Sequence, residues 1–414
     1  MIIIQSICGL FSILLIAYAV SEARKAVLVK SLIIAVFIHL SLTVIFLKLP
    51  IFKEIFLWLN KLVLALETAT TEGTSFVFGY VGGGAAPFAV ENEGLMFILA
   101  FKALPLILVI SALSYLLYYY RILPAVVKIF SYLLQKSLNI SGSVGLGVAA
   151  NAFVGMVESP LLIKPYLKTM TRGEIFSVMV AGMSTIAGTM MVLYAHILAP
   201  KIPGAMGHIL TASVLNVISS LIISMLMIPH QSDSQQDKVK LPQMALSAMD
   251  AIVKGTTDGV KLLINIIAML IVLVALVSLA NQILQFVPPV DNQPITLQSI
   301  LGLLMAPFMF LIGIPTSEIV TTGSLMGTKV ILNEFIAYME LLNLPADALQ
   351  ERSKIIMIYA MCGFANIGSL GIMVGGMTAM SPEKRDEIIS LGMKSVFAGV
   401  LATCFTATVV GLII

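Results

Sequence analysis

The chain has 414 residues, of which 59% are hydrophobic and only 11% are charged, and its mean hydropathy is +1.04. A soluble domain cannot bury so much apolar surface, so the composition excludes an ordinary soluble protein. The net charge of +3 is small and spread along the chain, so no nucleic-acid partner is expected. The apolar runs are about 20 residues long and do not alternate as barrel strands do, which predicts membrane-spanning helices.

Hydropathy predicts eight spanning helices. The first apolar run lacks a preceding basic region and a small-residue cleavage pattern, so we expect a retained helix rather than a signal peptide. Arg24, Lys25 and Lys30 follow this helix, which places both the amino terminus and, after eight crossings, the carboxyl terminus outside. The predicted spans are residues 2–20, 29–47, 94–120, 173–198, 204–228, 262–287, 353–380 and 387–414.

Three further features lie between the predicted spans. Phe52, Phe56 and Trp58 predict a helix at the membrane interface after the second span. Residues 230–243 form a polar linker, which we expect in the cytoplasm. The cysteines, Cys8, Cys362 and Cys404, lie in apolar runs without CxxC spacing, so neither a disulfide nor a zinc site is expected.

Two apolar segments are too interrupted to be simple spans. Residues 142–168 and 298–339 contain Gly, Pro and a carboxylate at mid-segment, Glu158 and Glu318, respectively. Non-helical backbone is tolerated at membrane depth only beside protein or water, so we expect two re-entrant hairpins that line a cavity. The predicted fold is therefore an all-α polytopic membrane protein with eight transmembrane helices and two opposed re-entrant hairpins in inverted repeats.

Four stretches combine Gly, Pro, Ser, Thr or Asn with unwinding signals. Such residues free backbone carbonyl and amide groups to meet a solute or an ion. Taken singly, each polar residue could instead be a helix-packing contact, and Glu158 could be a neutralised or paired structural group. Their matched placement in two halves is typical of a transporter site at the midplane. The stretches are Asn151 to Pro160, Ser184 to Thr189, Gly313 to Glu318 and Gly363 to Ser369.

Four motifs resemble those of the concentrative nucleoside transporters, which include bacterial nucleoside permeases. They are GTSFVFG (73–79), NAFVGMVESP (151–160), NEFIAY (333–338) and CGFANIGS (362–369). The resemblance implies a symporter of nucleosides in the bacterial inner (cytoplasmic) membrane, with a scaffold, a moving transport domain and a homotrimeric assembly. Sodium is the implied coupling ion, and no other cofactor is expected.

The resemblance also implies a domain division. Residues 1–120 would hold the first three scaffold helices and the interfacial helix, and 262–296 the sixth helix of the scaffold. Residues 121–228 and 297–414 would be the two transport-domain repeats, each with a hairpin, a broken helix and a final helix. Residues 229–261 would be a cytoplasmic linker.

Site residues are carried over by motif. Glu318, Asn366 and Ser369 would bind the sugar hydroxyls, and Phe364 would line the same pocket. A carboxylate accepts hydrogen bonds from hydroxyls, and an amide can both donate and accept. The implied sodium ligands are the side chains of Asn151 and Thr185 and the backbone carbonyls of Val154 and Ile186.

Two points about the ligands stay open. Thr185 stands where the family has Ser, which keeps the hydroxyl, and proton coupling through Glu158 is the alternative to sodium. At the base-facing turn, the family's Gly-Gln-Thr-Glu-Ala-Pro is replaced by GMVESP (155–160). Met156 and Val157 remove an amide and a hydroxyl, so we expect altered or broadened base selectivity unless Glu158 and water suffice.

Other classes of function are weighed against transport. An intramembrane enzyme could use Glu158 and Glu318 as acid and base, but the sequence has no nucleophile–base pair, metal signature or cofactor motif. A channel is a second alternative, although opposed hairpins favour alternating access. A proton-coupled symporter of a modified nucleoside or another ribosyl compound is the alternative within the transporter class.

Overall fold

The computed structural model describes residues 2–89, 97–156, 158–229, 245–289 and 294–414. Within these ranges the chain is helical and contains no strand, which confirms the predicted all-α class. Six helices or helix pairs of the described part are long and apolar enough to cross a membrane. They are Val29–Lys48, Leu99–Tyr119, Arg172–Leu198, Ala205–Met227, Ala248–Leu284 and Pro382–Ile413.

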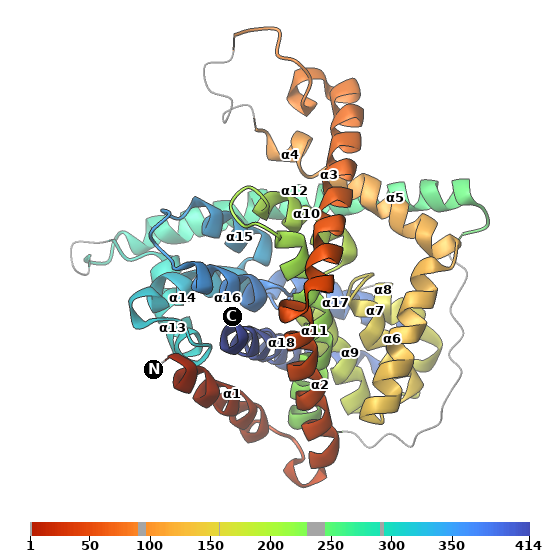
Figure 1. The fold of residues 1–414 in the computed structure, drawn as a ribbon, viewed down its shortest axis with the longest axis vertical. Helices are drawn as coiled ribbons and strands as arrows, with labels where there is room; N and C mark the ends of the chain where they lie inside the picture. Colours follow the sequence, from red (N-terminus) through yellow and green to blue (C-terminus); the bar gives the residue numbers. More distant parts are fainter. Residues whose placement is uncertain (1, 90–96, 157, 230–244, 290–293) are drawn as a thin grey trace.

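The described residues of the first half of the chain form eleven α-helices, drawn from red to green in Figure 1. They are α1 (Ile2–Ala19), α2 (Val29–Lys48), α3 (Pro50–Phe78), α4 (Leu99–Lys102), α5 (Leu106–Tyr119), α6 (Ile122–Leu138), α7 (Gly142–Asn151), α8 (Glu158–Leu162), α9 (Arg172–Ser184), α10 (Gly188–Leu198) and α11 (Ala205–Met227). The third predicted span is interrupted between α4 and α5 at Pro105, because proline cannot donate a helical hydrogen bond.

The second half is drawn from green to blue. Its helices are α12 (Ala248–Leu284), α13 (Leu297–Leu311), α14 (Ile319–Ile331), α15 (Glu334–Asn343), α16 (Glu351–Met361), α17 (Ile367–Met380) and α18 (Arg385–Ile413). Because α12 begins at Ala248, residues 248–261 are helical rather than part of a linker as the sequence had suggested. The polar linker 230–243 lies outside the described residues.

The two halves repeat one order of elements. Each begins with an apolar helix (α5, α12), continues with a further helix (α6, α13) and a helical hairpin (α7/α8, α14/α15), and ends with a broken helix (α9/α10, α16/α17) and a long helix (α11, α18). The broken helices correspond to two of the predicted spans, and their interruptions lie at Thr185–Ala187 and Cys362–Asn366. Both halves thus contain a hairpin followed by a broken helix, although the second hairpin (Ile319–Asn343) begins after the start of the predicted segment 298–339.

The core of the molecule is a bundle of α9, α11, α16 and α18. The most apolar stretch of α11 is 89% buried and that of the helix containing α18 is 83% buried, whereas that of α12 is not buried at all. In Figure 1, α11 and α18 accordingly lie at the centre. Helix α1 packs against α18, α13 and α11, and α2 packs against α11, so both belong to this central bundle.

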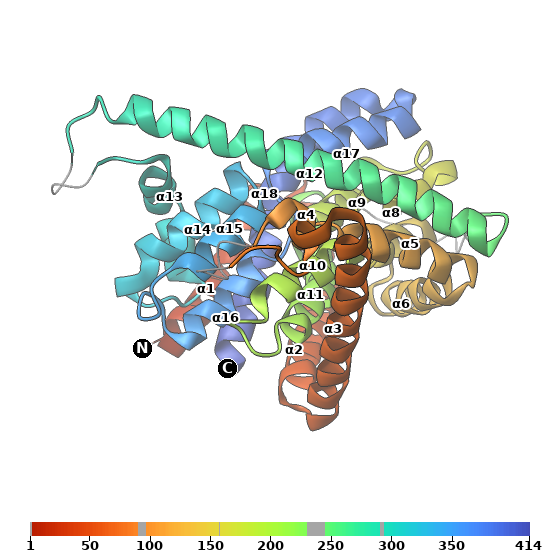
Figure 2. The same ribbon diagram turned by 90° about the horizontal axis from the view of Figure 1, so that it is seen from above.

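An outer layer is formed by α5 and α12. Figure 2 shows α12 running across one whole face of the molecule with α5 along part of its length. The residues of α12 that the structure buries are Ala251, Gly255 and Gly259, which are spaced four apart on one face. A Cβ on Gly255 would lie 2.7 Å from the Cα of Ala112, and the Ser111 hydroxyl donates to the Gly255 carbonyl over 2.7 Å. Small residues therefore allow the two backbones to touch.

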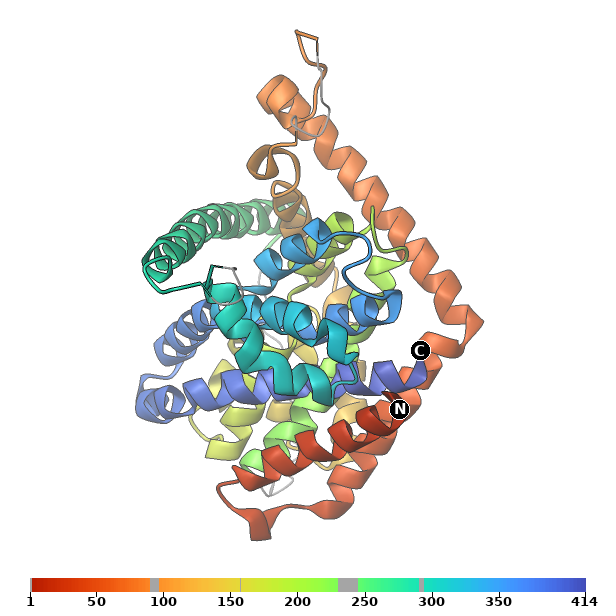
Figure 3. The same ribbon diagram turned by 90° about the vertical axis from the view of Figure 1, so that its left-hand side faces the viewer.

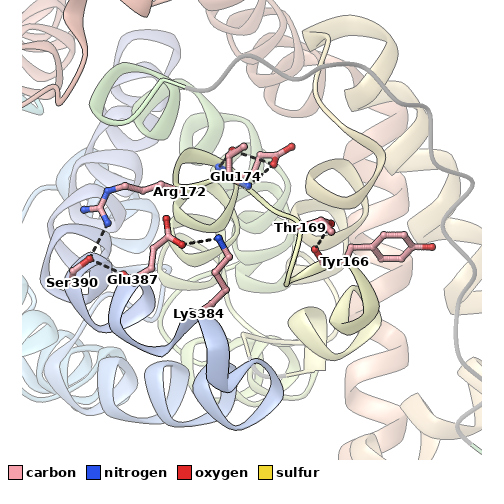
Figure 4. A network of polar contacts seen from close by, with 8 residues as sticks. Tyr166, Thr169, Arg172, Glu174, Lys384, Glu387 and Ser390 are labelled. Atoms are coloured by element: carbon pink, nitrogen blue, oxygen red, sulfur yellow. Dashed lines mark hydrogen bonds and ion pairs between the residues drawn. The ribbon is translucent and has the colours of Figure 1, made fainter.

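The two termini lie close together in Figure 3. On the side of the molecule away from them, charged side chains join the segment after α1 to α9 and α18. Glu22, after α1, accepts hydrogen bonds from Arg172 at the start of α9, both over 3.0 Å, and from Lys394 of α18. Figure 4 shows Arg172 also reaching the hydroxyl of Ser390 over 2.8 Å. The hydrogen bonds from Arg172, followed by those from Lys394, lower the pKa of Glu22 to about 2. We call Glu22, Arg172 and Lys394 the Glu22 ion cluster.

Candidate functional site

The two helix breaks cross each other inside the bundle. The amide of Phe364 donates to the carbonyl of Thr185 over 3.2 Å, which joins one break to the other. A Cβ on Gly363 would lie 2.6 Å from the carbonyl oxygen of Ser184, so only glycine permits this approach. Asn216 of α11 supports the crossing, because its amide nitrogen donates to the carbonyl of Cys362 over 2.7 Å.

The turn of the first hairpin reaches the same place. The amide of Gly188, at the start of α10, donates to the carbonyl of Phe153 over 2.9 Å. Gly155 has a φ of +127°, and a Cβ there would lie 2.6 Å from Glu158 Oε2 and 3.1 Å from the Cβ of Ala187. The hairpin turn therefore packs directly on the first helix break, as the sequence had suggested.

Two of the three residues expected to face a nucleobase, Met156 and Glu158, lie in the described part of the chain. Met156 is buried, and its Cβ lies 3.0 Å from where a Cβ on Gly182 would be, with Met373 of α17 close to the same point. Glu158 is the first residue of α8 and is exposed. Val157 lies outside the described residues. Met156 and Glu158 thus flank the turn, one packed into the bundle and the other open to solvent or solute.

Oxygen atoms without partners gather where this hairpin meets the first break. Asn151 is fully buried; its amide nitrogen donates to the carbonyl of Gly147 over 3.0 Å, while no described residue donates to its Oδ1. The hydroxyl of Thr185 lies 3.0 Å from the Asn151 carbonyl and 2.8 Å from that of Ala181, and donates its single proton to one of them.

Two neighbouring backbone carbonyl oxygens also lack a hydrogen-bond donor. Within the described ranges, no donor reaches the carbonyl oxygen of Val154 or Ile186. A buried acceptor without a donor is unfavourable unless a cation or water completes it. Hard cations bind carbonyl, amide and hydroxyl oxygens, so the four residues named from the sequence, Asn151, Val154, Thr185 and Ile186, fit a sodium ion in chemistry.

At the second helix break, polar side chains surround the start of α17. Asn366 is the N-cap of α17, and its Oδ1 accepts a hydrogen bond from the Ser369 amide over 2.6 Å. Its amide nitrogen donates to Glu334 Oε2 over 3.1 Å. Asn366 and Ser369 are 1% and 8% exposed, and Phe364 beside them is half-buried. The structure therefore brings together three of the four residues predicted to bind or line the sugar.

Glu318, the fourth, lies elsewhere. Its Oε1 accepts a hydrogen bond from the amide of Gln350, the residue before α16, over 3.1 Å. Asn366 follows the other end of this helix of 11 residues, so the two sites are separated by about 16 Å. The turn at Gly313–Glu318 is fastened by Arg352, which donates to the carbonyls of Gly313 and Gly411 at the end of α18. The structure does not bring Glu318 to Asn366.

Glu334, and not Glu318, is the carboxylate beside Asn366. It is the first residue of α15, it is 3% exposed, and its Oε1 accepts from the hydroxyl of Tyr194 of α10 over 2.5 Å. The hairpin turn that meets the second break is therefore Leu332–Asn333, between α14 and α15, and not residues 313–318. The available signal was the NEFIAY motif, in which Asn333 caps α15 and precedes a carboxylate.

The chain is similar to known proteins over nearly its whole length. Residues 8–81 match the family model for the Na+ dependent nucleoside transporter N-terminus, residues 100–201 the model for nucleoside recognition, and residues 208–411 the model for the Na+ dependent nucleoside transporter C-terminus. The chain is 32% identical over 415 residues to the nucleoside permease NupC of Helicobacter pylori, covering 99% of this chain and 97% of that protein. It is 30% identical to sodium/nucleoside cotransporter 2 of Rattus norvegicus over 99% of this chain and 62% of that protein.

Solved structures are also similar to this chain over its full length. CNTnw in an inward-facing substrate-bound state superposes with a TM-score of 0.91 at 31% identity, covering 100% of this chain and 98% of that chain. A CNTnw variant in an outward-facing state superposes with a TM-score of 0.89 at 30% identity, with the same coverage. With matches at this identity over the full chain, the protein belongs to the family of concentrative, Na+-dependent nucleoside transporters, which are membrane permeases and not enzymes.

Proposed function

We propose that the chain is a sodium-coupled symporter that imports nucleosides across the bacterial cytoplasmic membrane. The main support is the adjacency of two polar groups at the crossing of the helix breaks. Glu334, Asn366 and Ser369 form one group, and Asn151 and Thr185 belong to the other. The first group suits vicinal hydroxyls, and the second suits a small hard cation.

The sugar group is proposed with Glu334 in place of Glu318. The ionised carboxylate accepts hydrogen bonds from hydroxyls, while Asn366 donates to the carboxylate and orients it. Ser369 follows on the first turn of α17, and the ring of Phe364 offers an apolar wall for the sugar or base. Glu158, Met156 and Val157 are proposed to meet the base, with broadened selectivity because the amide and hydroxyl of the family pattern are missing.

The cation group is linked to the sugar group through backbone. The carbonyl of Thr185 accepts from the amide of Phe364, so a shift of the first break on cation binding moves the wall of the sugar pocket. Asn151, Val154, Thr185 and Ile186 are the proposed ligands. This linkage explains how cation binding can raise nucleoside affinity, and by reciprocity how nucleoside can raise cation affinity.

Alternating access is proposed to follow an elevator-like motion in a homotrimer. Helices α3, α5 and α12 are the proposed scaffold, since α12 exposes most of its surface and packs along α5. Helices α1 and α2 pack on the central bundle, so we assign them to the moving part and not to the scaffold suggested for residues 1–120. Both termini are proposed to lie outside, with the Glu22 ion cluster at the cytoplasmic end.

The experiment that tests the proposal is uptake into proteoliposomes of the purified chain. A panel of purine and pyrimidine nucleosides, free ribose and free bases is supplied with an inward sodium gradient, an inward proton gradient or no gradient. We expect accumulation of nucleosides above the external concentration only with sodium. Downhill flux alone would indicate a channel, and accumulation driven by protons would favour the alternative coupling.

A matched pair of variants tests the cation ligands. Thr185→Val removes the hydroxyl and keeps the shape, so we expect the half-saturating sodium concentration to rise about tenfold or more, corresponding to about 1.4 kcal/mol. Thr185→Ser keeps the hydroxyl and should retain sodium dependence close to that of the parent. Equal sodium dependence in the two variants would remove Thr185 from the ligand set.

A further inference from the structure

One buried charge has no role in the proposed transport cycle. Lys329 lies in the last turn of α14 and is completely buried. No residue of the described chain accepts a hydrogen bond from its ammonium group. A lysine that cannot extend its charged end to water is strongly unfavourable at membrane depth, and such residues persist where they pair with an opposite charge or serve function.

The surroundings of Lys329 contain one opposite charge. The groups that interact electrostatically with the ammonium are the carboxylate of Glu334 and the thiols of Cys362 and Cys404. Tyr194 and Tyr338 face the same carboxylate, Tyr194 through a hydrogen bond. Thiols and phenols are neutral at physiological pH. Among these neighbours within the described residues, Glu334 is therefore the one group that can carry a negative charge.

A second carboxylate on the same hairpin does not compete. Glu340 follows on α15, but it is only partly buried and is not among the groups that interact with Lys329. Lys329 and Glu334 are therefore the two charges of the second hairpin turn, one at the end of α14 and the other at the start of α15.

Both oxygens of Glu334 already accept hydrogen bonds. Oε1 accepts from Tyr194 and Oε2 accepts from Asn366, both neutral donors. Neutral donors alone do not balance a buried negative charge, and a buried carboxylate without a counter-charge takes up a proton. A proton on either oxygen would weaken these hydrogen bonds and reduce the capacity to accept from sugar hydroxyls.

We infer that Lys329 is a positioning residue that supplies the counter-charge of Glu334 and so keeps this carboxylate ionised for sugar hydroxyls. The inference rests on the proposed function and adds to it the state of charge of the sugar group. Because the two charges cancel, the pair of Lys329 and Glu334 moves no net charge across the membrane.

The test compares Lys329→Met with the parent over pH 6 to 9 at fixed sodium concentration. In the parent, nucleoside affinity should be independent of pH. In Lys329→Met, Glu334 is expected to be protonated at neutral pH, so affinity should be at least tenfold weaker there and should recover as pH rises. Lys329→Arg keeps the positive charge and should restore the flat profile.

Two further measurements keep the test independent of folding and of transport. The infrared spectrum of Lys329→Met should show a protonated-carboxyl band that is missing from the parent and from the double variant Lys329→Met/Glu334→Gln. The double variant has neither charge, so it should unfold at a temperature near that of the parent. A flat pH profile for Lys329→Met, or no new carboxyl band, would overturn the inference. Failure of the parent to transport nucleosides would overturn only the proposed function.

Discussion

At the scale of single residues, Asn366 has two tasks that different chemical groups perform. Its side-chain oxygen Oδ1 accepts the capping hydrogen bond of α17, and its side-chain nitrogen Nδ2 donates to Glu334. The cap is a contribution to stability of about 1 kcal/mol, whereas the hydrogen bond to a carboxylate contributes about 1.5–3 kcal/mol to the arrangement that binds sugar. The two tasks can therefore be separated by substitution.

Asn366→Ser should keep the cap and lose the donor to Glu334, because serine is a good N-cap but is too short to replace the amide. We expect its unfolding temperature to stay near that of the parent while nucleoside affinity falls by about tenfold to a hundredfold. Asn366→Ala should lose affinity similarly and also unfold at a lower temperature. Binding calorimetry and thermal unfolding in detergent measure the two effects, and equal stability of the two variants would argue against the cap.

The residues of the site were only partly predictable from the sequence. Asn151, Thr185, Asn366 and Ser369 were carried over by motif from the family resemblance, and each also lies in a stretch with unwinding signals. Glu334 was missed because the turn at Leu332–Asn333 contains neither Gly nor Pro, while Gly313 and Pro315 gave a stronger turn signal before Glu318. A helix can end by tertiary packing and a new N-cap alone, and hydropathy does not detect that.

At the scale of elements, the crossing of α5 and α12 depends on the small-residue face Ala251, Gly255 and Gly259. The lipid offers no hydrophobic advantage to a helix pair, so close backbone packing and interhelical hydrogen bonds must hold it. The Ser111 hydroxyl supplies one such bond to the carbonyl of Gly255. A side chain at this glycine would meet backbone atoms, which cannot move aside as a flexible side chain can.

Gly255→Leu is therefore expected to separate α5 from α12 and to lower stability by about 1–3 kcal/mol or more, as overpacking does. Thr256→Leu is the matched control, because Thr256 is the next residue of the same helix and is exposed. Thermal unfolding in lipid nanodiscs should show a lower transition temperature for the first variant and little change for the second. Similar behaviour of both variants would mean that the contact does not limit stability.

The elements themselves were better predicted than their turns. Apolar length located six of the eight predicted spans as described helices long and apolar enough to cross a membrane, because every backbone amide in a bilayer must be satisfied within a helix. The predicted spans 2–20 and 353–380 correspond to shorter apolar helices. The start of α12 at Ala248 was missed, since Asp250, Lys254 and Asp258 make its first turns polar. These turns are stabilised by the Ser247 N-cap and by the pair of Asp250 and Lys254 over 2.9 Å, and not by hydropathy.

At the scale of the whole molecule, the Glu22 ion cluster joins the ends of α1, α9 and α18. Glu22 also donates its backbone amide to the carbonyl of Met227 at the end of α11, over 2.8 Å. Four helices of the central bundle are thus fastened at one end. Since both cations lower the pKa of Glu22 from 4.5 to about 2, the cluster stabilises the fold above pH 4.5 and loses this effect as pH falls towards 2.

Glu22→Gln should unfold at a temperature a few degrees below that of the parent at pH 7, a modest effect because solvent screens the cluster. The difference should shrink between pH 4.5 and pH 3 as the parent's Glu22 begins to lose its advantage. Thermal unfolding at several pH values measures this. A difference that is constant with pH would show that the lost contribution is packing and not charge.

The relative motion of the bundle and the proposed scaffold can be tested where the two touch. His196 of α10 pairs with Glu67 of α3, with 3.0 Å between His196 Nδ1 and Glu67 Oε2. If α3 belongs to the scaffold and α10 to the moving part, this contact must break in each cycle. The Glu22–Lys394 contact lies within the bundle and should persist throughout.

Paired cysteines at positions 67 and 196, joined by a short thiol cross-linker, are therefore expected to stop nucleoside uptake, and cleavage of the linker should restore it. The same linker between cysteines at 22 and 394 should leave uptake largely intact, because it joins helices that move together. Both pairs are made with Cys8→Ser, since Cys8 is the exposed native cysteine and Cys362 and Cys404 are buried. Uptake that survives a complete 67–196 cross-link would place α3 and α10 in one rigid body, and the proposed scaffold would then reduce to α5 and α12.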